Sequence, residues 1–206
     1  MFGIPFTASA TNWSFMLGSG ADYNVPTRLK ITQSNHRNII VRHAHYKTHP
    51  FQSPIFYDIQ IGKWEDQAAW EIEFLHHKIY LEDRPAEIQN FSISHGYNLL
   101  YLNRAWLLKH DFRFRIGLGA VIAHPENEIN HKSLDHSRGG TFGRGYYLAG
   151  FSGQVGAGRR FYFTKHIYGS LGGKVLLSYA WVPVKDGDAV VPNLALYGIF
   201  GLGYST

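Results

Sequence analysis

The chain has 206 residues, of which 16% are aromatic, 22 are glycine and none is cysteine. This length suits one domain, and the lack of cysteine excludes disulfides and thiol chemistry. The formal net charge is +5, but the charged residues are scattered along the chain, which argues against nucleic-acid binding. Mean hydropathy is −0.21 and no run of about eighteen apolar residues occurs, which argues against helical membrane spans.

The N-terminal segment ends in Ala8-Ser9-Ala10, the small-residue pattern of a signal-peptidase site, but no basic stretch precedes it. We expect residues 1–10 to be either the remnant of a signal peptide or a disordered N-terminus. Residues 11–206 are expected to form a single domain, because the chain shows no internal repeat and no linker-like composition.

Ten segments alternate apolar with polar or small residues at a period of two, which predicts β-strands. In chain order they are residues 12–22, 27–33, 38–47, 55–65, 70–81, 88–102, 111–123, 146–163, 166–182 and 193–204. Strands of about ten residues with one apolar face, joined by alternating short and long connections, are typical of outer-membrane barrels. The sequence therefore predicts an all-β fold, an antiparallel up-and-down transmembrane β-barrel of about ten strands. Eight strands are the alternative, if residues 27–47 form an extension above the membrane.

The same alternation assigns side chains to the outside or the inside of the barrel. With the apolar face toward lipid, six charged side chains point inward. Three acids and three bases in a narrow barrel should pair, because an unpaired buried charge costs several kcal/mol. We therefore predict an interior charge network that plugs the barrel, made of Asp58, Glu71, Glu73, Arg113, Arg115 and Lys174. A soluble barrel or sandwich, with the apolar face inside, is the alternative.

Two weaker patterns point to chemistry. Ser94 and His95 suggest a serine nucleophile and its base, with Asp58 as the orienting acid, but neighbours on a regular strand face opposite ways and need a bulge to pair. His43 and His45 share one strand face at a spacing that can bind zinc or copper, although no third ligand lies nearby in sequence. We predict no cofactor, and no catalytic residue beyond these candidates.

Four segments carry a resemblance to known proteins: residues 70–80, 93–103, 117–126 and 145–150. The chain resembles the small outer-membrane β-barrel proteins of Gram-negative bacteria, a superfamily that includes opacity-type and OmpW-type barrels, and in particular its uncharacterised members. The resemblance implies a location in the bacterial outer membrane, contact with its lipids and lipopolysaccharide, and insertion by the barrel assembly machinery. It carries over no catalytic residue. Such barrels usually end in an aromatic residue, whereas here Tyr204 stands two residues before the last.

Three functions are compatible with these features. The favoured one is a structural or envelope-interaction role for a barrel with a charge-paired, plugged interior. The second is a lipid A-modifying enzyme of the deacylase or acyltransferase type, which would use Ser94, His95 and Asp58. The third is a narrow channel or carrier for small solutes, in which Gly117 and Gly119 would leave space inside the barrel.

Overall fold

The computed structural model describes residues 11–53, 55–135 and 137–206, so the predicted remnant or disordered segment at residues 1–10 lies outside the described residues. The described part contains the strands β1 (Thr11–Val25), β2 (Thr27–Gln33), β3 (Ile39–Ala44), β4 (Tyr46–Lys47), β5 (Tyr57–Glu65), β6 (Ala68–Leu81), β7 (Ile88–Leu107), β8 (Phe112–Ala123), β9 (Glu126–Ile129), β10 (Lys132–Ser133), β11 (Tyr147–Tyr162), β12 (Ile167–Val184) and β13 (Gly187–Ser205), with one 3-10 helix, η1 (Lys109–Asp111). No helix within these residues is long and apolar enough to cross a membrane.

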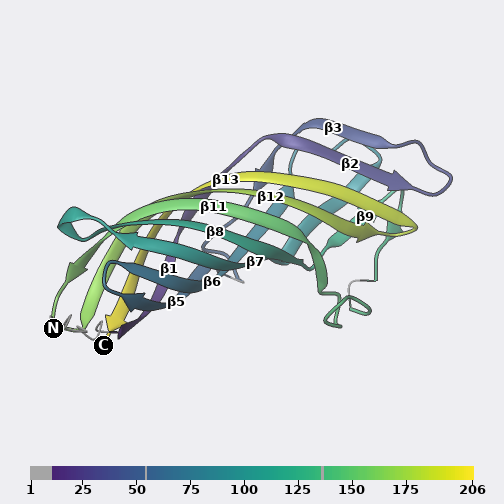
Figure 1. Ribbon diagram of the computed structural model, residues 1–206. Coiled ribbons are helices and arrows are strands. Elements are labelled where there is room, and N and C mark those ends of the chain that lie inside the picture. Colours follow the sequence, from purple (N-terminus) through teal and green to yellow (C-terminus); the bar gives the residue numbers. More distant parts are fainter. Residues whose placement is uncertain (1–10, 54, 136) are drawn as a thin grey trace, which may run out of the picture.

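Eight of the described strands form a closed ring in the order β1, β5, β6, β7, β8, β11, β12 and β13, with β13 paired back to β1. Every pairing is antiparallel. Closure gives each strand of the ring two hydrogen-bonded neighbours, so the ring has no free edge. Figure 1 shows the long strands running side by side, with the C-terminus at one end and β2 and β3 at the other. The predicted all-β, up-and-down antiparallel fold is confirmed.

The strand count differs from the prediction of about ten. The segments predicted at residues 27–33 and 38–47 lie outside the ring, which therefore matches the eight-stranded alternative, although the described sheet has thirteen strands in all. β1 follows β13 up to the pair Val25↔Leu194, and after Pro26 the chain continues along β13 as β2, up to Gly187↔Gln33. β3 then pairs only with β2. Alternation shows that a segment is a strand, but it cannot show which strand is its partner.

The ring presents a belt of exposed apolar side chains on its outer face. Each strand contributes at least two large ones: Phe15 and Leu17, Ile59 and Ile61, Trp70 and Ile72, Leu100 and Leu102, Ile116 and Leu118, Phe151 and Val155, Leu171 and Leu177, and Phe200 and Leu202. The inward positions between them are mostly polar or small. The ring thus has the reverse of the polarity of a water-soluble barrel.

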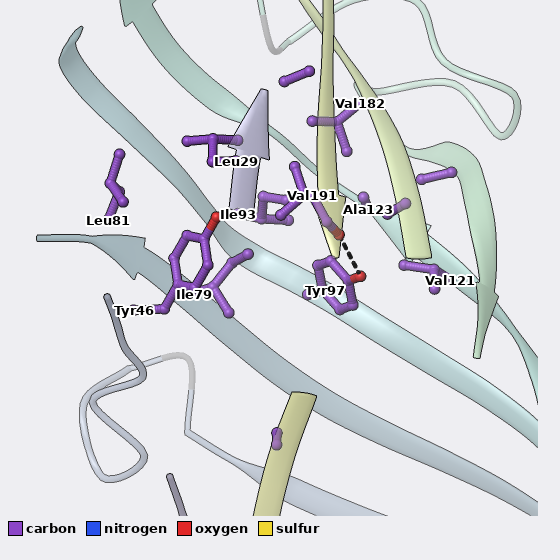
Figure 2. Packing of buried hydrophobic residues seen from close by; sticks show 14 of the residues in the cluster. Leu29, Tyr46, Ile79, Leu81, Ile93, Tyr97, Val121, Ala123, Val182 and Val191 are labelled. Carbon is purple, nitrogen blue, oxygen red and sulfur yellow. Dashed lines mark hydrogen bonds between the residues drawn. The ribbon is translucent and has the colours of Figure 1, made fainter. Parts of the chain in front are cut away.

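Beyond the belt the barrel continues as an extension with an apolar core. On β12 the last polar inward side chain is Ser178, and the inward side chains that follow it, Ala180, Val182 and Val184, are apolar and buried. β2 and β9 cover this core with residues such as Leu29 and Ile129. Figure 2 shows side chains from β2, β4, β6, β7, β8, β12 and β13 converging on it, with the Tyr97 hydroxyl donating a hydrogen bond of 3.3 Å to the Val191 carbonyl. The apolar core fills the barrel at this end.

Candidate functional site

The centre of the ring holds a buried ion triad. The Lys174 Nζ of β12 contacts the Asp58 Oδ2 of β5 at 2.9 Å and also contacts the Glu73 carboxylate of β6. All three side chains are at most 3% exposed. Close by, the Arg115 Nε of β8 lies 3.1 Å from the Glu71 Oε2 of β6. Five of the six predicted interior charges therefore come together as two sets of ion pairs, drawn from four strands.

Amide side chains satisfy part of the remaining hydrogen-bonding capacity of these carboxylates, and the Asp58 Oδ1 is left without a hydrogen-bond partner among the described residues. Gln154 and Asn103 each donate to the Glu73 Oε2 at 2.8 Å, and Gln154 also donates to the Asn103 Oδ1 at 2.8 Å. Gln60 donates to the Asp58 Oδ2 at 3.0 Å. Buried carboxylates are stabilised only when both the charge and the other lone pairs have partners. The network therefore joins β5, β6, β7, β11 and β12 across the barrel.

Arg113, the sixth predicted charge, lies apart from this network. Its guanidinium stacks over the Trp64 ring at 5.3 Å and donates to the Asp111 carbonyl and the Tyr162 hydroxyl. Arg160, which the sequence analysis did not predict as an interior charge, stacks over the Tyr168 ring of the neighbouring strand β12 at 4.1 Å and also lies 5.6 Å from the Trp64 ring. The two-residue period that places Gln154 inside also places Arg160 inside, so the signal was present in the sequence.

Little space remains between these side chains. A hollow of about 30 Å³ lies among the charged groups, lined in part by Asp58, Arg115 and Lys174, and it has room for about one or two water molecules. Gly117, expected to leave space inside the barrel, does not do so. A Cβ atom at this glycine would lie 1.8 Å from the Asn103 Oδ1, because the amide of Asn103 already fills that space.

A second cluster surrounds a bulge in β7. The pairing of β6 with β7 shifts between His77↔Tyr97 and Ile79↔Ile93, so β7 carries two extra residues here. Gly96 takes a φ of +133°, and a Cβ there would lie 2.1 Å from the Asn98 side chain, so only glycine fits. Bulges redirect side chains, and this one turns His95 outward with 56% of its side chain exposed.

The bulge allows the side chains of the neighbouring residues Ser94 and His95 to approach each other, which a regular strand would prevent. The Ser94 Oγ lies 3.3 Å from the His95 Nδ1, and the Glu126 Oε1 of β9 also contacts this same nitrogen. A serine relay needs the acid on one ring nitrogen and the serine on the other, whereas here both groups meet Nδ1. Asp58 lies in the interior triad, so the acid that accompanies His95 is Glu126.

His124 completes the cluster from the segment between β8 and β9. Its ring lies 5.2 Å from the His95 ring and 4.7 Å from the Tyr146 ring. The histidine pair predicted as a metal site lies elsewhere: His43 is on β3 and His45 follows it, both exposed. Within the described residues, the structure brings together one group of three side chains that can bind a metal: His95, His124 and Glu126. The sequence analysis did not predict this group.

No protein-family model matches the chain, and no curated protein sequence matches it. Several solved structures are similar in fold. Neisserial surface protein A (NspA) is 8% identical with a TM-score of 0.42, covering 94% of this chain and 96% of that one. Ail, the attachment invasion locus protein of Yersinia pestis, is 10% identical with a TM-score of 0.39, covering 95% and 97%. The outer membrane protein AlkL, determined in DMPC bilayers, is 10% identical with a TM-score of 0.48, covering 100% and 95%.

We predict that Lys174→Met lowers the free energy of unfolding by about 3–5 kcal/mol, because it leaves two carboxylates buried without their cation. The measurement is urea unfolding of the detergent-folded protein. The triple variant that also carries Asp58→Asn and Glu73→Gln should recover most of the loss. Lys63→Met is the matched control, since Lys63 forms an exposed ion pair with Glu65 at 3.1 Å and should change stability by less than about 1 kcal/mol. Equal effects of Lys174→Met and Lys63→Met would contradict the buried-triad interpretation.

Proposed function

We propose that this chain is an integral β-barrel of the bacterial outer membrane, with a closed interior and a structural or envelope-interaction role. The observation that carries the proposal is the ring of exposed apolar side chains around a buried, charge-paired interior. In this proposal the belt contacts outer-membrane lipids and lipopolysaccharide, and the barrel assembly machinery inserts the chain into the Gram-negative envelope.

The height of the belt supports the proposal. On β12 the exposed apolar residues run from Ile167 to Leu177, a rise of about 33 Å along the strand and about 25 Å along the barrel axis at a tilt of about 40°. That height equals the apolar band of outer-membrane barrels. Tyr179 and Trp181 follow directly on the same face, where aromatic rings with one polar atom suit headgroup depth.

The contents of the interior favour a closed barrel over a channel. An eight-stranded ring is just wide enough for side chains to fill, and here the ion pairs, the amide network and the apolar core occupy successive levels of it. Conduction would require these groups to separate and leave buried charges unpaired.

A second candidate function is modification of lipid A, which the position of the β7 bulge favours. Leu148 pairs with Ile122, and Tyr97 pairs with the next residue, Ala123. Leu148 is the exposed apolar residue of β11 nearest to this end of the barrel. His95 therefore lies just outside the apolar belt, at the depth proposed for lipid headgroups. An ester or phosphate group of an outer-leaflet lipid would lie within reach of this cluster.

Leu118→Arg tests the membrane location. Leu118 is 76% exposed, so an arginine there would be neutral in a water-soluble protein. In a bilayer we expect it to destabilise the folded barrel by about 2–4 kcal/mol, measured by urea unfolding from lipid vesicles. Ile40→Arg is the matched control, because Ile40 is exposed on β3, outside the ring, and should cost less than about 1 kcal/mol. A neutral result at both positions would refute the membrane barrel.

The closed interior predicts that the reconstituted protein shows no single-channel conductance in planar bilayers. The matched variant Lys174→Met/Asp58→Asn/Glu73→Gln removes the charges but keeps the volume, so it should be equally silent. Stepwise conductance of the wild-type protein would support the channel and overturn the closed interior.

Lipid A mass analysis separates the two candidate functions. If the role is structural, bacteria expressing the wild-type chain should have the same lipid A mass profile as bacteria expressing His95→Asn. A loss or gain of an acyl chain that depends on His95 would instead establish the enzyme. Ser94→Ala then tells whether the serine takes part, because a serine nucleophile cannot be replaced by alanine.

A further inference from the structure

We propose that His95, His124 and Glu126 form a binding site for a divalent transition-metal ion of the zinc type, on the outer face of the barrel at the β7 bulge. One nitrogen from each imidazole and one carboxylate oxygen lie within 4.8 Å of one another. The proposal does not depend on the membrane location or on the envelope role.

Three separate features of the backbone bring the ligands together. The bulge at Gly96 turns His95 outward. The His124 amide donates to the Gly96 carbonyl at 3.0 Å, which ties the end of β8 to the bulge. Glu126 pairs with Ser92 across β9 and β7. The site is therefore held by main-chain hydrogen bonds, and ion binding needs only side-chain movement.

The required movement is small. The ligands of a tetrahedral zinc ion with bonds of about 2.1 Å lie about 3.4 Å apart. The most distant pair here must approach by little more than 1 Å, while His95 and Glu126, now joined by a hydrogen bond, must separate to admit the ion. His124 is 7% exposed and packs on Tyr146, so it is the fixed member of the set, and the exposed His95 is the member that adjusts.

The donor set selects the kind of ion. Two imidazoles with one carboxylate suit Zn²⁺ and Co²⁺, whereas Mg²⁺ and Ca²⁺ prefer oxygen ligands. Three protein ligands leave the fourth tetrahedral position free for water or an outside oxygen atom, as in catalytic zinc sites. The exposure of His95 places that open position toward the exterior of the barrel. A metal-bound water there, and not Ser94, would be the reactive group if the cluster performs hydrolysis.

Cobalt titration tests the site with the full-length, detergent-folded protein. We expect Co²⁺ to bind at one ion per chain with the visible absorption of a tetrahedral complex, and Zn²⁺ to displace it, while millimolar Mg²⁺ has no effect. Glu126→Gln and His95→Asn each remove one ligand, and each should weaken binding at least about 100-fold, since even the loss of a supporting group beyond the ligands costs 10–100-fold. Heat-dependent gel mobility verifies that each variant is folded.

The double variant His43→Asn/His45→Asn is the matched control, because these two exposed histidines belong to no three-ligand group among the described residues. This variant should bind Co²⁺ like the wild type. The absence of a one-to-one cobalt complex in the wild-type protein would overturn the proposal. So would folded Glu126→Gln and His95→Asn variants that bind as tightly as the wild type, or loss of binding in the control.

Discussion

The contact of Lys174 with Asp58 and Glu73 is the interaction on which the closed barrel depends. These residues stand 116 and 101 positions apart in sequence, on β12, β5 and β6, and they meet only once the ring has closed. The closed ring leaves room for only about one or two water molecules among these charges, so an open ring exposes them and a closed ring must pair them. Closure and charge pairing are therefore coupled. The amides of Gln154 and Asn103 extend the coupling to β11 and β7, because they occupy the oxygen of Glu73 that lysine does not use.

The extension beyond the ring continues the same strands, but there apolar side chains fill the interior. β12 keeps its two-residue period from Ile167 to Val184, yet its last polar inward side chain is Ser178, and the inward side chains after it, at Ala180, Val182 and Val184, are all apolar. Ordinary aqueous folding produces an apolar interior, whereas a lipid environment produces an apolar exterior. In the proposed outer-membrane location, a single strand that carries both patterns passes from lipid to water near Trp181. This change of polarity also explains why β2 and β9 pair with β13 and β7 only in the extension. An apolar core must be covered from water, and these extra strands cover it.

The sequence predicted the features that follow from local periodicity. Alternation alone placed Arg115 and Glu71 on the inside and Leu118 on the outside, because facing depends on the parity of a position within its strand. It could not predict that β2 continues along β13, since partner choice depends on contacts more than 150 residues away. It also could not assemble the cluster at His95. Parity fails at a bulge, and the two extra residues of β7 are visible only in the register with β6. Glu126, on a four-residue strand, carried no periodic signal of its own.

The position of the bulge follows from the same constraint as the pairing of the interior charges. In the hydrocarbon region every backbone amide and carbonyl must be satisfied within the protein, so an irregular strand is tolerated poorly there. The ten residues of β7 from Tyr97 to Trp106 pair without interruption with both β6 and β8, and the register of β7 shifts beyond that stretch, at the bulge around Gly96 and again between Ile88 and Asn90. Beyond that level, water can hydrate a backbone group that the bulge leaves unpaired. Polar, outward-facing chemistry on this barrel is thus restricted to its rim, and the rim is where His95, His124 and Glu126 meet.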